Sequence, residues 1–546
     1  MDMLALGTLY HSLERNVARF GSRPAYMVPA MEGRAYHPEG REYSWSETWN
    51  EVEARKSRYA AAGYGPGHRV AILFDQRPEF VFHHFALNAL GCSTVPISPD
   101  YRQEEIAHLL GHSKSCLALA IAPRLDDVRS AAAMLPASVP VLLFDDLARP
   151  LPPPPVPASA IGLDGTTEAA LLYTSGTTGR PKGCIMSNEY FHTFGHWFAT
   201  RGGRLAMQDG VERLYNPLPL HHANCLSISL PAMLLRGGCL VFPDRFHSAT
   251  FWKDIVAARV TALQFQGVIP NILLKLPVTP EESEHRVKFA LCAGVEPSQH
   301  AAFEARFGIP LVEMWAMSET GRLTTDHLEP RQIHTRAIGR SEPGFELSVI
   351  DETGNEAAVG QPGELVVRHS EETPRKGFFS GYLDDPRATE EAWRDGWFHS
   401  GDMAYRDDSR MYYFADRKKN IIRRSGENIA AAEVEGCLVA HDKVRQVAVI
   451  AVADELREEE VMACVVLHDP ADRGEALARE LAGWCRERLA YFKAPAYCLF
   501  VDALPTGSSQ KFAKAKLFPA GVDPRTVAGV IDLRSLKKPP AKASAH

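Results

Sequence analysis

The stretch that decides the fold runs Tyr173-Thr174-Ser175-Gly176-Thr177-Thr178-Gly179-Arg180-Pro181-Lys182-Gly183. Glycines let a backbone approach an anion closely, and the Ser and Thr hydroxyls between them supply short donors. Lys182 adds a point charge that suits a polyphosphate. The stretch is not a P-loop, because Gly176 and Gly179 are too close together and Gly183 stands where a magnesium-binding hydroxyl belongs. It therefore predicts a nucleotide-binding loop of another class.

Bulk composition limits the classes of protein to which this chain can belong. At 546 residues it is expected to form two or more domains, and 45% hydrophobic with 23% charged residues is typical of a soluble globular protein. A net charge of -7 gives no reason to expect nucleic acid as a partner. No apolar run reaches about 18 residues, so we expect no membrane span. The ten cysteines are scattered without a C-x-x-C pair, which indicates free thiols and a cytoplasmic location.

Alternating apolar and amphipathic segments surround the loop. Short apolar runs at 70–74, 94–97, 117–121 and 139–144 alternate with helical patterns, which predicts doubly wound α/β layers. The pattern changes to strands and turns at about 339–415, where we predict a small β-barrel subdomain. Beyond it the order is helix, strand, strand, helix. We therefore predict a large N-terminal domain at 1–418, a small α+β domain at 419–530 and a flexible tail at 531–546.

Further motifs follow the loop in a fixed order and carry a resemblance to a known family. The chain resembles the acyl-adenylate-forming (AMP-binding) superfamily, in its acyl-CoA synthetase branch. The segments 412–417 and 424–428 are most similar to crotonobetaine/carnitine–CoA ligases. The motifs are Pro219-Leu220-His221-His222, Ala293-Gly294-Val295-Glu296-Pro297, Trp315-Ala316-Met317-Ser318-Glu319-Thr320, Gly396 to Asp402, Asp416-Arg417-Lys418-Lys419, Ser425-Gly426-Glu427-Asn428 and Leu504 to Lys511.

The resemblance implies an ATP-dependent acid–CoA ligase. Such an enzyme activates a carboxylic acid as acyl-AMP, releases pyrophosphate, and transfers the acyl group to the thiol of CoA. ATP, Mg²⁺ and CoA are the implied cofactors, and a small-molecule carboxylic acid is the implied partner. Both reactants are anionic, so the protein must neutralise charge and align them. Two alternatives stay open: an acyl-AMP ligase that loads a separate carrier protein, and a non-catalytic nucleotide sensor on the same fold. A homodimer is also left open.

Residue by residue, the resemblance implies a divided nucleotide site. Glu319 is the expected magnesium ligand, Thr320 the neighbour of the α-phosphate, and Asp402 the acceptor of both ribose hydroxyls. The family usually has tyrosine where Trp315 stands, and an indole can also stack on adenine. The complete set expected to bind ATP or AMP is Thr174, Ser175, Gly176, Thr177, Thr178, Lys182, Gly294, Val295, Glu296, Trp315, Ala316, Met317, Asp402 and Arg417.

The resemblance also implies motion of the C-terminal domain. Lys511 matches the family's catalytic lysine for adenylation, and Lys419 matches the hinge about which the domain turns before the thioester step. Gly426 and Glu427 are then expected at the tunnel that admits the CoA thiol. The family often has glycine where Ser425 and Gln510 stand, so the path of these two loops is left open.

The acid is the least determined part of the reaction. His222 belongs to the motif that gates the acyl pocket in the family, and His221 replaces the commoner phenylalanine. We expect the pocket to include Trp197, His221, Phe265 and Gln266, a mixed lining that disfavours a long fatty acid. A trimethylammonium group could lie against Trp197 or Phe265 by cation–π attraction. A small polar, carnitine-like or aryl acid is therefore expected.

Overall fold

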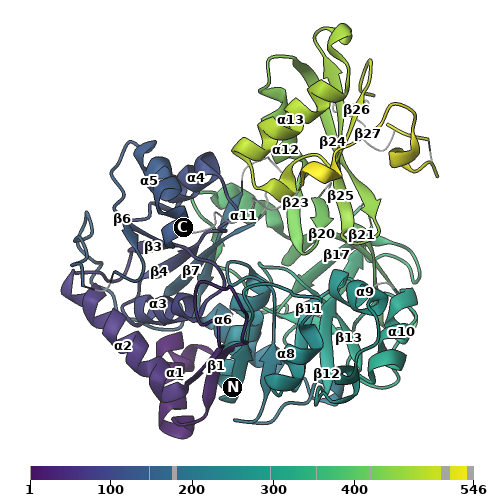
Figure 1. Cartoon of the computed structure of the whole chain (residues 1–546). Coiled ribbons are helices and arrows are strands. Elements are labelled where there is room, and N and C mark those ends of the chain that lie inside the picture. Colours follow the sequence, from purple (N-terminus) through teal and green to yellow (C-terminus); the bar gives the residue numbers. More distant parts are fainter. Residues whose placement is uncertain are drawn as a thin grey trace.

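The computed structural model describes residues 2–146, 148–174, 181–295, 297–351, 353–417, 421–505, 517–519 and 521–537. Figure 1 shows a large lower part that carries the N-terminal residues and a smaller upper part that carries α12, α13 and β24 to β27. Among the described residues, every helix is too short or too polar to cross a membrane.

The quoted loop connects two strands of the first sheet. The sheet runs in the order β18-β8-β7-β4-β3-β5-β6, with β4, β3, β5 and β6 parallel to one another and β7 parallel to β4. These strands match the apolar runs of the sequence. Their bounds are β3 (Arg69–Leu73), β4 (Ser93–Pro96), β5 (Leu117–Ala120), β6 (Val141–Leu143), β7 (Glu168–Thr174), β8 (Lys182–Ser187) and β18 (Gly381–Tyr382).

A second sheet provides most of the remaining framework of the site. It runs in the order β14-β13-β12-β11-β9-β10-β1-β2, and its inner strands are parallel while β2 and β14 pair antiparallel at the two edges. The bounds are β1 (Pro24–Val28), β2 (Arg41–Ser44), β9 (Arg213–Tyr215), β10 (Cys239–Val241), β11 (Ala262–Gln266), β12 (Phe289–Ala293), β13 (Leu311–Ala316) and β14 (Leu323–Thr325).

Helices cover both faces of each of these sheets, as the alternation of buried residues requires. Val70 and Ile72 of β3 join the core between the two sheets, whereas Ala71 and Leu73 pack toward α4 and α5. The result is the predicted arrangement of α/β layers. The helices are α1 (Leu9–Phe20), α2 (Trp45–Ala61), α3 (Pro78–Ala89), α4 (Gln103–Ser113), α5 (Leu125–Ala133), α6 (Asn188–Ala199), the π-helix η4 (Asn224–Ser229), α7 (Leu230–Arg236), α8 (Phe251–Ala257), α9 (Val268–Lys275) and α10 (Pro297–Phe307).

The segment predicted to be rich in strands forms an antiparallel sheet. Its order is β15-β21-β20-β17-β16, and β19 pairs with β20. Asp402 lies in β20 directly opposite Arg417 of β21, so the register brings two predicted ribose-site residues together. The elements are β15 (Ala337–Gly339), β16 (Glu346–Ile350), β17 (Gly363–Arg368), α11 (Pro386–Ala392), β19 (Trp393–Arg394), β20 (Trp397–Arg406) and β21 (Tyr412–Arg417).

The C-terminal region, residues 421–537, has its own sheet and its own core. The sheet runs β23-β22-β25-β26-β27, and β24 pairs with β25. α12 and α13 bury Leu438 and Leu481 against it. The elements are β22 (Ile421–Arg424), β23 (Glu427–Ala430), α12 (Ala431–Val439), β24 (Val444–Asp454), β25 (Glu458–Leu467), α13 (Glu475–Arg488), β26 (Tyr497–Phe500) and β27 (Ile531–Asp532).

The predicted flexible tail is wrong for its first part. β27 pairs with β26, Leu533 is fully buried, and the Lys537 ammonium donates to Glu460 at 2.6 Å. Glu460 also accepts from Arg424, so a single buried carboxylate joins β22, β25 and the end of the described chain. The Lys- and Pro-rich composition of the tail did not reveal this anchor.

Candidate active site

Several strands of both sheets end at one cavity. β7 ends at Thr174, β11 at Gln266, β12 at Ala293 and β13 at Ala316, and open α/β sheets place ligands at such carboxyl ends. The cavity has a volume of about 220 Å³. Its described lining residues come from both parts of the chain and are Thr174, Phe194, His222, Ala223, Asn224, Ile228, Gln266, Ala293, Met314, Ala316, Met317, Ser318, Glu319, Ser400, Gly401, Asp402, Arg423 and Gly426.

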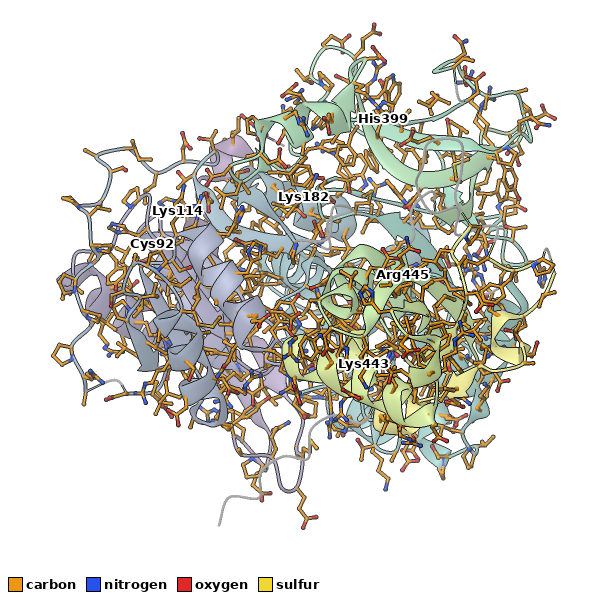
Figure 2. All side chains as sticks on the ribbon, turned by 90° about the horizontal axis from the view of Figure 1, so that it is seen from above. Cys92, Lys114, Lys182, His399, Lys443 and Arg445 are labelled. Carbon is orange, nitrogen blue, oxygen red and sulfur yellow. The ribbon has the colours of Figure 1, made fainter. Side chains whose placement is uncertain are left out.

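The described residues at the two ends of the quoted loop pair with each other. Thr174 pairs with Lys182 across the β7–β8 ladder, and Thr174 also lines the cavity. The Lys182 ammonium lies 4.7 Å from the centre of the Tyr382 ring. Figure 2, which looks down on the molecule, labels Lys182 near the middle of the view. Ser175, Gly176, Thr177 and Thr178, together with the predicted sites at Glu296, Lys419 and Lys511, lie outside the described residues.

Glu319 is a buried carboxylate at the edge of the cavity. It is 6% exposed, and its Oε1 accepts a hydrogen bond of 3.0 Å from the Tyr382 hydroxyl. Burial, followed by the charge of Glu319, raises the pKa of Tyr382, so the phenol stays protonated and keeps donating. Tyr382 therefore links Glu319 to Lys182. The sequence motifs did not single it out.

Asp402 faces the same cavity from β20. It is 8% exposed, and its Oδ2 accepts from the indole N–H of Trp315 at 2.9 Å. The Trp315 ring is buried and stacks on Phe345 at 6.5 Å between centroids. The stacking of Trp315 on adenine stays a prediction. The structure adds a second role, because the indole N–H orients the carboxylate that we expect to bind ribose.

Thr320 contacts its own turn, and its predicted place beside the α-phosphate stays a prediction. Its side chain is fully buried, and its hydroxyl lies 2.9 Å from the carbonyl oxygen of Met317 and 2.8 Å from that of Arg322. The hydroxyl therefore closes the turn that follows β13. Thr320 positions Glu319 through the backbone and does not reach the cavity.

The Gly294–Val295 turn is fixed by a carboxylate that the sequence motifs missed. Glu313 of β13 accepts from the Gly294 N–H at 2.8 Å and from the Val295 N–H at 2.9 Å. Burial raises the pKa of Glu313 to about 7, although these two hydrogen bonds oppose the shift. An acidic residue inside the apolar strand Leu311–Ala316 was the signal that could have identified it.

A hairpin of the C-terminal region closes the cavity. The turn between β22 and β23 contains Gly426 at φ 89°, and a Cβ there would lie 2.6 Å from the Gln266 side-chain oxygen. Glycine is therefore required both by the backbone and by the close approach. Arg423 of β22 reaches the Gly294 turn, where its guanidinium is 3.2 Å from the position of a Cβ.

His222 and Glu427 connect the two parts of the chain beside this hairpin. His222 Nε2 lies 2.9 Å from Glu427 Oε2. Burial alone would lower the pKa of His222, but the Glu427 carboxylate outweighs it and the pKa is raised. Burial opposes the ionisation of Glu427, yet the charge and hydrogen bond of His222 lower its pKa to about 2. The two side chains therefore form an ion pair.

Two known protein families match this chain. Residues 13–383 match the family of AMP-binding enzymes, and residues 433–511 match the AMP-binding enzyme C-terminal domain. The chain belongs to the family of AMP-binding enzymes. Its relatives place it in the acyl-CoA synthetase branch. The crotonobetaine/carnitine–CoA ligase of Proteus mirabilis (strain HI4320) is 30% identical over 541 residues, which cover 95% of this chain and 100% of the relative. The enzyme of that name from Escherichia coli O7:K1 is 29% identical over 87% of this chain and 93% of its own length.

Solved structures agree on the fold of this AMP-binding enzyme. A mutant o-succinylbenzoate CoA synthetase from Bacillus subtilis, bound to a product analogue, superposes with a TM-score of 0.79 at 23% identity, covering 93% of this chain and 97% of that one. A malonyl-CoA ligase with methylmalonyl-CoA and AMP bound superposes with a TM-score of 0.71 at 26% identity, covering 89% and 97%. The second structure holds both an acyl-CoA product and AMP in its own site.

The predicted acyl pocket and the residues that line the cavity agree at Gln266 but differ at Phe265 and Trp197. Gln266 lines the cavity, but strand alternation turns Phe265 into the opposite core, where it packs against Phe303. Trp197 donates its N–H to the Leu323 carbonyl oxygen, and the Arg201 guanidinium lies 4.2 Å from its ring centre. The Arg201 guanidinium therefore already contacts the Trp197 ring that we predicted to bind a trimethylammonium group.

A network of amide side chains gives this wall of the cavity its polar character, and no sequence motif predicted it. Asn224 Oδ1 accepts from Asn216 at 3.1 Å and from Gln264 at 3.0 Å. Ser229 is 2.6 Å from the Gln264 side-chain oxygen. Asn224 itself lines the cavity beside Phe194 and Ile228, since the π-helix η4 begins at this residue. The amide is thereby held rigidly at an otherwise apolar wall.

His221 lies outside this cavity. It lines a separate space of about 80 Å³, together with Tyr101, Tyr173 and Lys493. Burial lowers the pKa of His221 to about 3, so its imidazole is neutral at neutral pH. We predicted that His221 contacts the acyl group, but in this structure it lies at the junction of the two parts of the chain.

Proposed function

We propose that this enzyme is an ATP-dependent acid–CoA ligase that forms acyl-AMP and then the thioester. The observation that carries the proposal is the meeting of Glu319, Asp402 and the Gly426 hairpin at one cavity. A carboxylate with two acceptor oxygens suits a ribose diol, and the missing side chain at Gly426 lets the hairpin pack directly on Gln266 at the cavity wall.

Mg²⁺ is proposed as the ion that accompanies ATP. Mg²⁺ is bound through one or two carboxylates plus substrate phosphates and keeps several waters. Glu319, a buried carboxylate that lines the same cavity as Thr174, fits this pattern, and Tyr382 links it to Lys182. When bound, the ion supplies charge neutralisation on the phosphates. Tyr382 orients Glu319 for that role, and Lys511 is proposed to neutralise charge on the adenylate.

The acid is proposed to be small, with a polar group that Asn224 and Gln266 can reach. Both relatives compared above are named for crotonobetaine and carnitine. The contact between Arg201 and Trp197 removes one site for a trimethylammonium group, which leaves Phe194 and Met314 as apolar surfaces near the rigid amide. A hydroxylated acid of carnitine size suits this wall better than a plain fatty acid. Its hydroxyl can pair with the half-buried Asn224 amide or with the Gln266 side-chain oxygen, which is buried and has no hydrogen-bond partner among the described residues, and such an atom costs about 1–3 kcal/mol when it stays unpaired.

The experiment is a pyrophosphate-release assay with and without CoA. The acids are carnitine, its analogue without the hydroxyl, an aryl acid and a fatty acid of equal chain length. We expect CoA-dependent thioester formation with the hydroxylated acid and a loss of about tenfold or more without the hydroxyl. Asn224→Ala should remove most of that difference, whereas Asn50→Ala, the same change at an exposed position of α2, should keep it. Absence of a CoA thioester with every acid would refute the ligase assignment.

The two half-reactions test the proposed roles of Lys511 and Lys419. Lys511→Ala should block pyrophosphate release yet spare thioester formation from supplied acyl-AMP. Lys419→Pro should do the reverse, because it stiffens the expected hinge. Equal loss of both half-reactions in both variants would contradict a site that is used in two orientations.

A further inference from the structure

Two histidines of the N-terminal part and one carboxylate of the C-terminal region converge at the junction of the two parts. One ring nitrogen from each of His221 and His222 and one oxygen of Glu427 all lie within 4.8 Å of one another. The two imidazole rings are 4.5 Å apart between centroids. Within the part of the chain that the structure describes, this is the group of three such ligand atoms that could hold a metal ion.

His221 has a nitrogen that the protein does not use. Its Nε2 is buried, and no hydrogen-bond partner reaches it from the described residues. An unpaired polar atom in a buried place is costly and calls for a ligand. The adjoining space of about 80 Å³ is lined by all three side chains of the cluster, so it can admit an ion or a water molecule.

We propose that His221, His222 and Glu427 bind a divalent transition-metal ion of the Zn²⁺ type, and that this ion fixes the C-terminal region in the orientation seen here. Two imidazoles and a carboxylate form a donor set that Zn²⁺ prefers, whereas Mg²⁺ prefers oxygen ligands alone. Zn²⁺ forms bonds of about 2.0–2.2 Å to nitrogen and oxygen, so the three ligand atoms must move closer to a common centre by roughly an ångström. The position of Glu427 on the hairpin after β22 makes the site complete only in this orientation.

The site uses other ligands than the proposed Mg²⁺ site. His222 lines both spaces, but Glu319 belongs to the cavity of about 220 Å³ and takes its hydrogen bond from Tyr382. His221 and Glu427 face the smaller space, which Tyr101 and Lys493 also line. Metal binding to the cluster needs no ATP, acid or CoA. It therefore stands or falls independently of the proposed reaction.

Direct binding is tested with Co²⁺ as a spectroscopic substitute for Zn²⁺, on the untagged full-length protein freed of metal. We expect a saturable visible absorption that Zn²⁺ removes by competition. His221→Phe, which keeps the ring size, and Glu427→Gln, which keeps the shape, should each weaken binding at least about tenfold. His334→Phe makes the same change at an exposed histidine and serves as the control. Equal affinity in wild type, His221→Phe and Glu427→Gln would overturn the proposal.

Fixation of the orientation is tested by hydrogen exchange of the β22–β23 hairpin with and without Zn²⁺. We expect slower exchange of the hairpin amides in wild type and in His334→Phe, and no change in His221→Phe. Because exchange compares each protein with itself, a partly destabilised variant still gives a result. Binding without added protection of the hairpin would overturn the proposed fixation and leave a metal site that does not act on domain orientation.

Discussion

The C-terminal region touches the rest of the chain at α4 and at α9, and the two contacts use different chemistry. At α4, the Lys493 ammonium donates to Glu105 at 2.7 Å and to Glu433 of its own region at 2.8 Å. Lys493 is 4% exposed and Glu105 8%. At α9, Asn271 and Lys275 donate to the backbone oxygen of Glu455 at 2.8 and 3.2 Å on the exposed surface.

The two contacts differ in how strongly they hold the C-terminal region in its orientation. Burial would lower the pKa of Lys493, but Glu105 and Glu433 outweigh it and raise that pKa, so the cluster stays ionised. Removing one partner from such a cluster leaves an uncompensated buried charge. An exposed hydrogen bond to a carbonyl oxygen exchanges readily with water. A rotation of the region must therefore rehydrate the α4 contact, whereas the α9 contact can break at little cost.

The largest effect is expected when the cation of the α4 contact is removed. Lys493→Met leaves the carboxylates of Glu105 and Glu433 without their shared cation, which should lower the free energy of unfolding by about 3–5 kcal/mol. Urea denaturation followed by circular dichroism measures it. Lys443→Met makes the same change at a partly exposed ion pair with Asp472 and should cost less than about 1 kcal/mol. Similar losses in both variants would remove the distinction drawn between buried and exposed contacts.

An intermediate effect is expected when only the link across the two parts is cut. Glu105→Gln leaves Lys493 paired with Glu433, so the C-terminal region keeps its own ion pair while its docking on α4 loses about 1–3 kcal/mol. Thioester formation from supplied acyl-AMP should fall by about tenfold, with a smaller change in pyrophosphate release. Glu104→Gln alters the exposed neighbour on the same helix and is the control. An unchanged ratio of the two half-reactions would count against docking by α4.

A smaller, pH-dependent effect is expected at the His222–Glu427 pair. The pKa of Glu427 is lowered to about 2 and that of His222 is raised. The pair is therefore fully ionised between about pH 4.3 and pH 6.5, the usual pKa values of the two groups. Its contribution is lost as pH rises through the raised pKa of His222, and as pH falls toward the lowered pKa of Glu427. Protection factors of the hairpin amides, which divide out the base-catalysed intrinsic exchange rate, should be lower at about pH 9 than at about pH 6 when no metal is added. Glu427→Gln should abolish most of this dependence.

The α/β layers follow from local patterns in the sequence, because apolar runs of strand length predict the parallel core. Glu319 and Asp402 were predicted in another way, from the resemblance of their motifs to a known family. Contacts between distant segments could not be predicted in either way. The bond from Trp315 to Asp402 depends on the position of β20, and whether Trp197 faces a substrate depends on Arg201 beside it. No sequence pattern predicted the role of Lys493, because its partners Glu105 and Glu433 are 388 and 60 residues away along the chain.

The smallest effect is expected at α9, and it completes the comparison. Lys275→Ala removes an exposed ammonium that contacts a carbonyl oxygen, so the free energy of unfolding should change by less than about 0.5 kcal/mol. The same urea titration measures it. Combining Lys275→Ala with Glu105→Gln should give the sum of the single effects, since the two sites lie on different faces of the C-terminal region and share no partner. A combined loss well above that sum would show that the α9 contact becomes important once α4 releases the region, and the two contacts would then act as alternatives in one motion.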